Sequence, residues 1–167
     1  MIFWQTARSA KAARPGARIP RTAAPHGTIV YVDSREHYGY SFAAHQALLE
    51  RRVLSAGDYA VMEGETIIAA VERKRFDDFA TSLVDGSLNF AMAELAGLPR
   101  AAIAVEGTYS ALLRHSYASA GFLSELLARV QIRYPHVPIN LLESRKLAEE
   151  WTYQYLMVAY AILDHGP

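Results

Sequence analysis

Two acidic side chains and a lysine fall on two predicted neighbouring strands. Residues 66–71 form an apolar run typical of a strand, and Glu72 and Lys74 continue it two residues apart, so their side chains point to the same face. Asp58 precedes a second strand at 59–62, and the polar link 63–65 is typical of a hairpin. We therefore expect Asp58 and Glu72 to lie opposite each other, with Lys74 beside them.

Two carboxylates in this arrangement repel each other unless one of them takes up a proton or a cation lies between them. Mg²⁺ is a suitable cation, because one or two carboxylates, a carbonyl oxygen and several waters complete its shell. A lysine beside the metal can hold or deprotonate a water, or stabilise charge on a phosphate. The arrangement therefore fits hydrolysis of a phosphodiester. The spacing alone fits equally a solvated Glu–Lys pair and a Gly–Asp turn.

The order of the predicted elements places these residues in a mixed sheet. After the strand at 28–32 we expect a helix at 40–52, the hairpin, and helices at 76–84 and 87–98. A strand at 101–105, a helix at 119–133, a strand at 139–142 and a helix at 144–163 follow. The early strands pair as a meander and the later ones alternate with helices. The predicted class is α/β, a mixed sheet flanked by helices on both faces.

Three motifs resemble the nuclease domain of the XPF family of structure-selective endonucleases. They are Val32-Asp33-Ser34-Arg35-Glu36, Gly57-Asp58-Tyr59, and Val71-Glu72-Arg73-Lys74 followed by Asp78. The signature of that family is Gly-Asp, a gap, Glu-Arg-Lys, three residues and Asp, and this chain matches it. The stretch 82–88 and Val105-Glu106-Gly107 are also similar to the family, and the likeness covers about residues 28–163.

This resemblance implies a restriction-endonuclease-like (PD-(D/E)XK-type) fold and Mg²⁺- or Mn²⁺-dependent cleavage of branched, fork or flap DNA in repair or recombination. It implies metal binding at Asp58 and Glu72, with Asp33 lining the metal site, and it makes Lys74 the catalytic lysine. The accessory members of the catalytic pocket would be Arg35, Glu36, Arg73 and Asp78.

Two departures from the family pattern leave other functions open. Ser87 stands where the family usually has an arginine, and Asn89 lies near a position that is often glutamine. The chain ends at Pro167, whereas the family normally appends a tandem helix-hairpin-helix module that grips DNA. The alternatives are a non-catalytic nuclease-fold scaffold that binds DNA or a nuclease partner, and a nuclease of the same fold that acts on RNA. A separate DNA-binding partner is a further expectation.

The net charge of zero hides an uneven distribution. Residues 1–27 carry five basic residues and no acid, whereas residues 28–167 carry 12 basic and 17 acidic residues. We interpret 1–27 as a flexible basic arm and 28–167 as the nuclease domain. The arm is a mobile tail, a nucleic-acid-binding arm or an organelle transit peptide. A neutral total argues against holding nucleic acid by bulk charge alone.

Composition and the last helix bear on compartment and assembly. The chain has no cysteine, which excludes disulfides and thiolate-bound zinc, and no apolar run long enough to cross a membrane. We expect an intracellular, cytoplasmic or nucleoid-associated protein. The helix at 144–163 is apolar nearly all round, which fits either a buried core helix or an interface. Because members of the resembled family dimerise through this region, we expect a homodimer through this helix.

Overall fold

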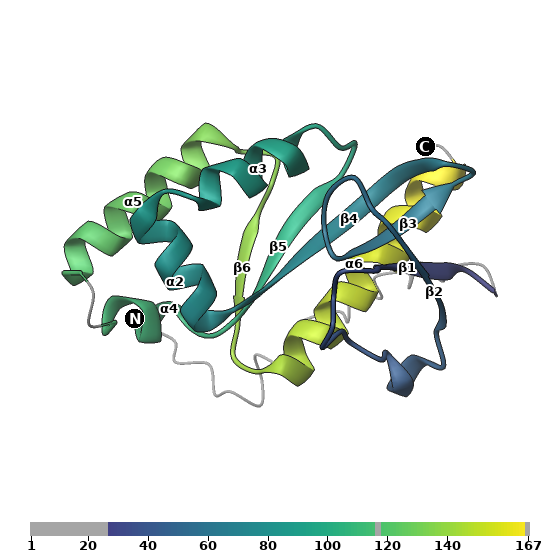
Figure 1. Ribbon diagram of the computed structural model, residues 1–167, viewed down its shortest axis with the longest axis horizontal. Coiled ribbons are helices and arrows are strands. Elements are labelled where there is room, and N and C mark those ends of the chain that lie inside the picture. Colours follow the sequence, from purple (N-terminus) through teal and green to yellow (C-terminus); the bar gives the residue numbers. More distant parts are fainter. Residues whose placement is uncertain (1–26, 116–117, 166–167) are drawn as a thin grey trace, which may run out of the picture.

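A six-stranded mixed sheet forms the centre of the computed structural model, which describes residues 27–115 and 118–165 (Figure 1). The strand order is β2-β1-β3-β4-β5-β6. The β1–β2, β4–β5 and β5–β6 pairs are parallel, and the β1–β3 and β3–β4 pairs are antiparallel. The strands are β1 (Ile29–Asp33), β2 (Leu48–Arg52), β3 (Tyr59–Glu63), β4 (Thr66–Arg75), β5 (Ala101–Glu106) and β6 (Ile139–Leu142).

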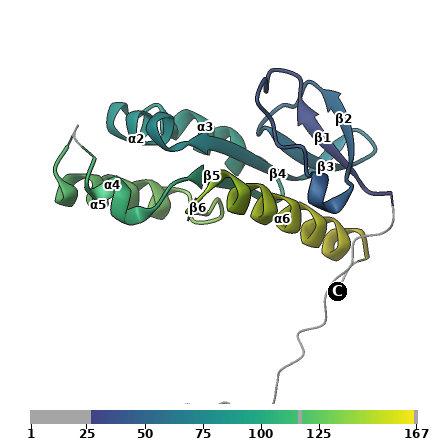
Figure 2. The ribbon, with the colours of Figure 1, turned by 90° about the horizontal axis from the view of Figure 1, so that it is seen from below.

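Helices cover both faces of this sheet. Helices α2 (Phe76–Asp85) and α3 (Leu88–Ala96) lie on one face of β4 and β5, and α5 (Ala120–Arg133) packs against α2 and the short α4 (Tyr109–Leu113). Helix α6 (Arg145–His165) crosses β3, β4 and β5 on the opposite face, as Figure 2 shows. This arrangement confirms the predicted class, an α/β fold with a mixed sheet between helices.

The β3–β4 hairpin is the element that positions the acidic pair. It turns at Gly64, which has a φ of 57°, and the two strands pair from Tyr59↔Val71 to Glu63↔Thr66. Strand β4 then runs beyond its hairpin partner to Arg75 and pairs in parallel with β5. The polar residues 72–74 are therefore held by their pairing with β5, just past the end of the hairpin. Helix α2 begins directly after the strand.

The helix predicted at 40–52 is wrong. A single turn of 3₁₀ helix, η1 (Ala43–His45), is followed by β2, which pairs with the outer side of β1. Phe42 and Gln46 both have a φ of 50°, a left-handed conformation that ends a helix on either side of the turn. The apolar residues at helical spacing do not form one buried face: Tyr40 packs on Tyr59, whereas Ala43, Ala44 and Leu48 are exposed.

Alternation along the strands divides the core between the two faces. Ile103 and Val105 pack with α2, α3 and α5, whereas Ala104 joins Val71 and Leu156 on the face that α6 covers. The stacked rings of Tyr40 and Tyr59, 5.0 Å apart, close this second cluster near one end of the sheet. The short helix α4 is an element that the sequence pattern does not predict.

Two sequence predictions concern the ends of the chain and the membrane. Apart from Gly27, the predicted basic arm at 1–27 lies outside the described residues. In the described ranges 27–115 and 118–165, we find no helix with the length and apolar character that a membrane span requires.

Candidate active site

Asp58 and Glu72 lie side by side where β3 begins beside β4. The Asp58 N–H donates to the carbonyl of Val71 at 2.9 Å, and the Arg73 N–H donates to Asp58 Oδ2 at 2.7 Å. The backbone of β4 therefore holds the Asp58 carboxylate in place. Gly57 makes this approach possible: its φ is 79°, and a Cβ there would lie 3.0 Å from the Cβ of Ala70.

The electrostatics of this pair show an excess of buried negative charge. Burial, followed by the nearby charge of Glu72, raises the pKa of Asp58 from 3.8 to about 7. Burial also raises the pKa of Glu72, although Lys74 opposes this effect. Lys74 Nζ lies 3.6 Å from Glu72 Oε1, and both side chains are largely buried. One lysine thus compensates two carboxylates incompletely, and the residues present fit a cation placed between them.

Asp33 does not join this pair as a free carboxylate. Its Oδ1 accepts hydrogen bonds from the Arg35 N–H and from Arg35 Nε, both at 2.8 Å. Its Oδ2 accepts from Arg35 Nη2 and from the Leu54 N–H, also at 2.8 Å. The Arg35 hydrogen bond and the two backbone N–H groups hold the pKa of Asp33 at about 2 against the effect of burial. These four donors occupy both oxygens, so Asp33 anchors the loop after β1; that Asp33 also lines a metal site stays a prediction.

Asp33 nevertheless contacts Asp58 through the backbone. The Asp33 N–H donates to the carbonyl of Asp58 at 2.8 Å, so the end of β1 fixes the start of β3. Asp33 binds the exposed Arg35 guanidinium in turn. The pKa of Arg35 is raised by Asp33 first, and also by the charges of Asp58 and Glu94.

Arg73 points to the opposite face from Glu72 and Lys74. Its Nε donates to Glu106 Oε1 at 2.7 Å, and Nη1 lies 3.4 Å from Glu36 Oε1. The guanidinium also lies over the ring of Tyr40, 5.3 Å from its centroid. Arg73 therefore joins β4, β5 and the loop after β1, while its backbone N–H holds Asp58.

The remaining predicted residues divide between the two faces. Glu36 is close enough for its charge to raise the pKa of Asp58 and of Glu72. Asp78 is exposed in the first turn of α2, and among the described residues it is not joined to the pair by a hydrogen bond or an ion pair. Glu94 on α3, to which no sequence motif points, contributes charge at Glu72 instead. Glu106 stands out in the sequence only through the Val-Glu-Gly similarity, although it is the principal partner of Arg73.

The donor set suits a hard cation held partly by water. Among the described residues, no group of three acidic, histidine or cysteine side chains converges as a ready-made metal cage. A site of two carboxylates is typical of Mg²⁺, which usually keeps several waters and takes further oxygens from a phosphate substrate.

The mixed sheet, the helices on both faces and the hairpin-borne acidic pair define a restriction-endonuclease-like fold. The structure of XPF from Aeropyrum pernix in complex with DNA matches 79% of this chain with a TM-score of 0.64 and 25% sequence identity. A second structure of XPF from the same organism matches 83% of the chain with a TM-score of 0.66 and 24% identity. In both comparisons the match covers 64% of the XPF chain.

The ERCC4 domain model matches residues 32–155, and this chain belongs to the ERCC4 domain family. The ERCC4 domain-containing protein EP364R of African swine fever virus (strain Badajoz 1971 Vero-adapted) is 50% identical over 46 residues, 27% of this chain and 13% of the viral protein. The same protein from isolate Warthog/Namibia/Wart80/1980 is 39% identical over 64 residues, 36% of this chain and 18% of that protein. The chain thus matches only a small part of these viral relatives. The predicted XPF-type nuclease domain is confirmed as to family and fold.

Proposed function

We propose that this chain is a divalent-metal-dependent endonuclease that hydrolyses phosphodiester bonds in branched, fork or flap DNA. The observation that carries the proposal is the buried Asp58–Glu72 pair with Lys74 beside it, on a fold shared with XPF in complex with DNA. Asp58 and Glu72 would hold Mg²⁺ or Mn²⁺. When bound, the cation would polarise the scissile phosphate and lower the pKa of a bound water.

The protein's own residues would divide the remaining work. Lys74, partly buried and on the same face as Glu72, would orient or deprotonate the attacking water or stabilise charge on the phosphate. The Arg73 N–H, which donates to Asp58 Oδ2, would fix the orientation of the Asp58 carboxylate. Asp33 and Arg35 would act as positioning residues that hold the end of β1 against β3. We leave Asp78 without a role at the metal, because its side chain is exposed on α2.

A non-catalytic scaffold is the second candidate, and the turn before α3 favours it. Ser87 stands where the resembled family usually has an arginine, and its N–H is occupied by Asp85 Oδ1 at 2.8 Å. The Asn89 amide donates to the Gly86 carbonyl at 3.1 Å, so it caps the turn rather than pointing freely outward. A scaffold would bind branched DNA through the same surface and leave it uncut.

One experiment separates these functions. Labelled flap, fork and duplex DNA, together with a matched RNA flap, are incubated with Mg²⁺ or Mn²⁺ and with wild type, Asp58→Ala or Lys74→Ala. Glu63→Gln, an exposed carboxylate on the same hairpin, is the control. The proposal expects cutting of branched DNA that both active-site variants lose and the control keeps. Cutting that survives both substitutions refutes the site, and tight binding without cutting supports the scaffold.

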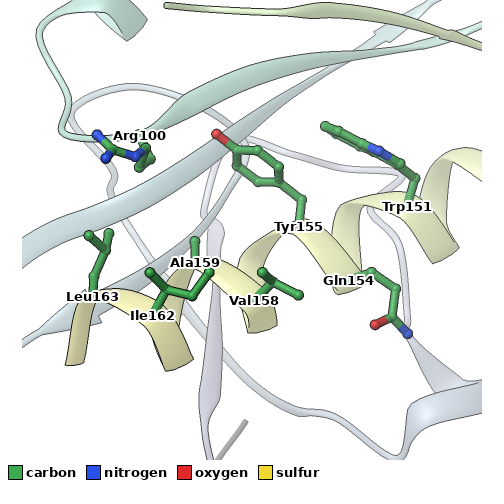
Figure 3. A pocket seen from close by; sticks show the side chains of 8 residues that line it. All are labelled: Arg100, Trp151, Gln154, Tyr155, Val158, Ala159, Ile162 and Leu163. Atoms are coloured by element: carbon green, nitrogen blue, oxygen red, sulfur yellow. The ribbon is translucent and has the colours of Figure 1, made fainter. Parts of the chain in front are cut away.

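We also propose that two copies associate through α6. The second half of this helix carries the exposed Val158, Ile162 and Leu163. With Arg100, Trp151 and Tyr155 they line an apolar cavity of about 370 Å³ (Figure 3). Trp151 and Tyr155 stack 5.0 Å apart, and Tyr and Trp are favoured at interfaces. Sedimentation should give twice the monomer mass of 18.5 kDa, and Ile162→Glu should give the monomer.

A further inference from the structure

The loop after β1 is held by three arginines from three different elements. Arg51 on β2 donates to the carbonyl of Glu36 at 3.0 Å. Arg73 on β4 and Arg145 at the start of α6 both donate to the carbonyl of Tyr38, at 3.2 and 2.7 Å. Arg145 also donates to the carbonyl of Gly39 at 3.0 Å. Charged donors make strong hydrogen bonds, so this exposed loop has a well-defined backbone.

The side chain of Tyr38 projects from this fixed backbone into solvent. Its N–H donates to Glu36 Oε1 at 2.9 Å, which fixes the residue from the other side. Yet 81% of Tyr38 is exposed, whereas the next tyrosine, Tyr40, is buried on Tyr59. Figure 1 shows the segment between β1 and η1 running beside the first half of α6. The loop thus presents one aromatic ring that packs into neither core cluster.

Tyr38 lies near the candidate active site, on the face of β4 to which the Arg73 side chain points and Glu72 and Lys74 do not. Glu36, which accepts the Tyr38 N–H, is close enough to Asp58 to raise its pKa. Arg73, which holds the Tyr38 carbonyl, donates its own N–H to Asp58. A nucleic acid strand with its phosphate at Asp58 and Glu72 would carry its neighbouring nucleotides across the nearby edge of the sheet. A strand that passes over this edge from the Glu72 face to the Arg73 face would meet the exposed ring and the half-exposed guanidinium of Arg145.

We propose that Tyr38 is a stacking site for an unpaired nucleobase of the substrate, next to the phosphate that is cut. A base inside a duplex has both faces covered by its neighbours, whereas an unpaired base at a branch has a free face for an aromatic ring. Arg145 would contact the adjoining phosphate. Such an aromatic ring on a fixed loop would favour branched over plain duplex DNA. The inference rests on the proposed nuclease function.

The test measures binding without cutting, in the full chain and in Ca²⁺. A flap substrate carries 2-aminopurine at the unpaired nucleotide next to the junction, and a second flap is abasic there. Wild type, Tyr38→Ala, Tyr38→Phe and the control Phe122→Ala, an exposed aromatic on α5, are compared by anisotropy and 2-aminopurine fluorescence. Thermal melting verifies that each variant is folded, which the exposure of Tyr38 favours.

Tyr38→Ala should lose about tenfold in affinity for the flap and none for duplex, since base–aromatic stacking is typically of that size. Wild type should lose a similar factor on the abasic flap, and Tyr38→Ala should not distinguish the two flaps. Tyr38→Phe and Phe122→Ala should behave as wild type. Equal losses on flap and duplex, or an unchanged response to the abasic site, overturn the stacking site.

The two proposals fail in different ways. If wild type quenches 2-aminopurine and Tyr38→Ala does not, but wild type never cuts with Mg²⁺ or Mn²⁺, the nuclease function fails and Tyr38 remains a site that stacks an unpaired base. If wild type cuts flaps and Tyr38→Ala binds them equally well, the stacking site fails and the nuclease function stands. If wild type does not bind flap DNA at all, both are overturned.

Discussion

Replacing Asp58 with asparagine should stabilise the metal-free protein, increasingly so as the pH rises. In the folded chain the pKa of Asp58 is about 7 against an ordinary value of 3.8, because the group is buried beside Glu72. A group whose folded pKa is raised contributes stability below its unfolded pKa, and this contribution is lost as the pH rises through the folded value. Wild type should therefore lose the stability that Asp58 contributes over a pH range from about 4 to above 7.

The size of the effect follows from the same two values. One pKa unit corresponds to about 1.36 kcal/mol, so the full difference is worth up to about 4 kcal/mol, shared with Glu72 as the neighbouring charge. Asparagine carries no charge, and its side-chain oxygen can still accept the Arg73 N–H that Asp58 Oδ2 accepts at 2.7 Å. The variant and wild type should therefore be close in stability at pH 4 and differ by a few kcal/mol at pH 8.

Urea unfolding in EDTA at pH 4, 6 and 8 measures this difference directly. Glu72→Gln should change stability in the same direction, and Glu63→Gln on the same hairpin serves as the exposed control. Mg²⁺ should reduce the advantage of Asp58→Asn at pH 8, because metal binding stabilises only the wild-type site. An advantage that is constant with pH, or a variant less stable than wild type at pH 8, would refute the account of the buried charge.

Three further substitutions test the positioning residues. Asp33→Asn should lower the free energy of unfolding by about 2 kcal/mol at pH 7, because a buried carboxylate loses charge-assisted hydrogen bonds; urea unfolding and faster exchange of the Leu54 amide measure this. That loss should shrink as the pH falls from about 4 towards 2, where wild-type Asp33 itself takes up a proton. Gly57→Ala should cost about 1–3 kcal/mol and weaken Mg²⁺ binding by calorimetry, because its φ of 79° and the 3.0 Å approach to Ala70 exclude a methyl group. Arg73→Met should cost about 3 kcal/mol by unfolding, because Glu106 is left partly buried with only Tyr40 and Arg145 as partners, and a gain in stability would contradict that role.

The hairpin is predictable from the sequence because its geometry is local. A short polar link fixes the register of two strands, and strand alternation places Glu72 and Lys74 on one face and Arg73 on the other. Spacing along the chain is therefore enough to place Asp58 and Glu72 together. Because side chains alternate between the two faces, the continuous apolar run at 101–105 predicts a strand that is buried on both faces, as β5 is.

The surroundings of the hairpin are not predictable in the same way, because they depend on contacts between distant segments. The Leu54 N–H that donates to Asp33 comes just after β2. The apolar spacing at 40–52 predicts a helix where β2 lies, so this contact cannot be foreseen from it. Tyr40 and Phe42 instead pack on Tyr59, a contact between distant segments that the spacing does not reveal. Likewise, Glu106 meets Arg73 only because β4 and β5 pair in one particular parallel register.

Single-turnover cleavage of a labelled DNA flap in Mg²⁺ measures directly whether Asp58 and Lys74 act in catalysis. The rate is compared between wild type, Asp58→Asn, Lys74→Met and the control Glu63→Gln, with each protein in excess over the substrate. Wild type and Glu63→Gln should cut at equal rates. Asp58→Asn and Lys74→Met should lose at least about 100-fold, the usual size for groups that act directly in the reaction. Rates for Asp58→Asn and Lys74→Met close to that of wild type would contradict the assignment of the catalytic site.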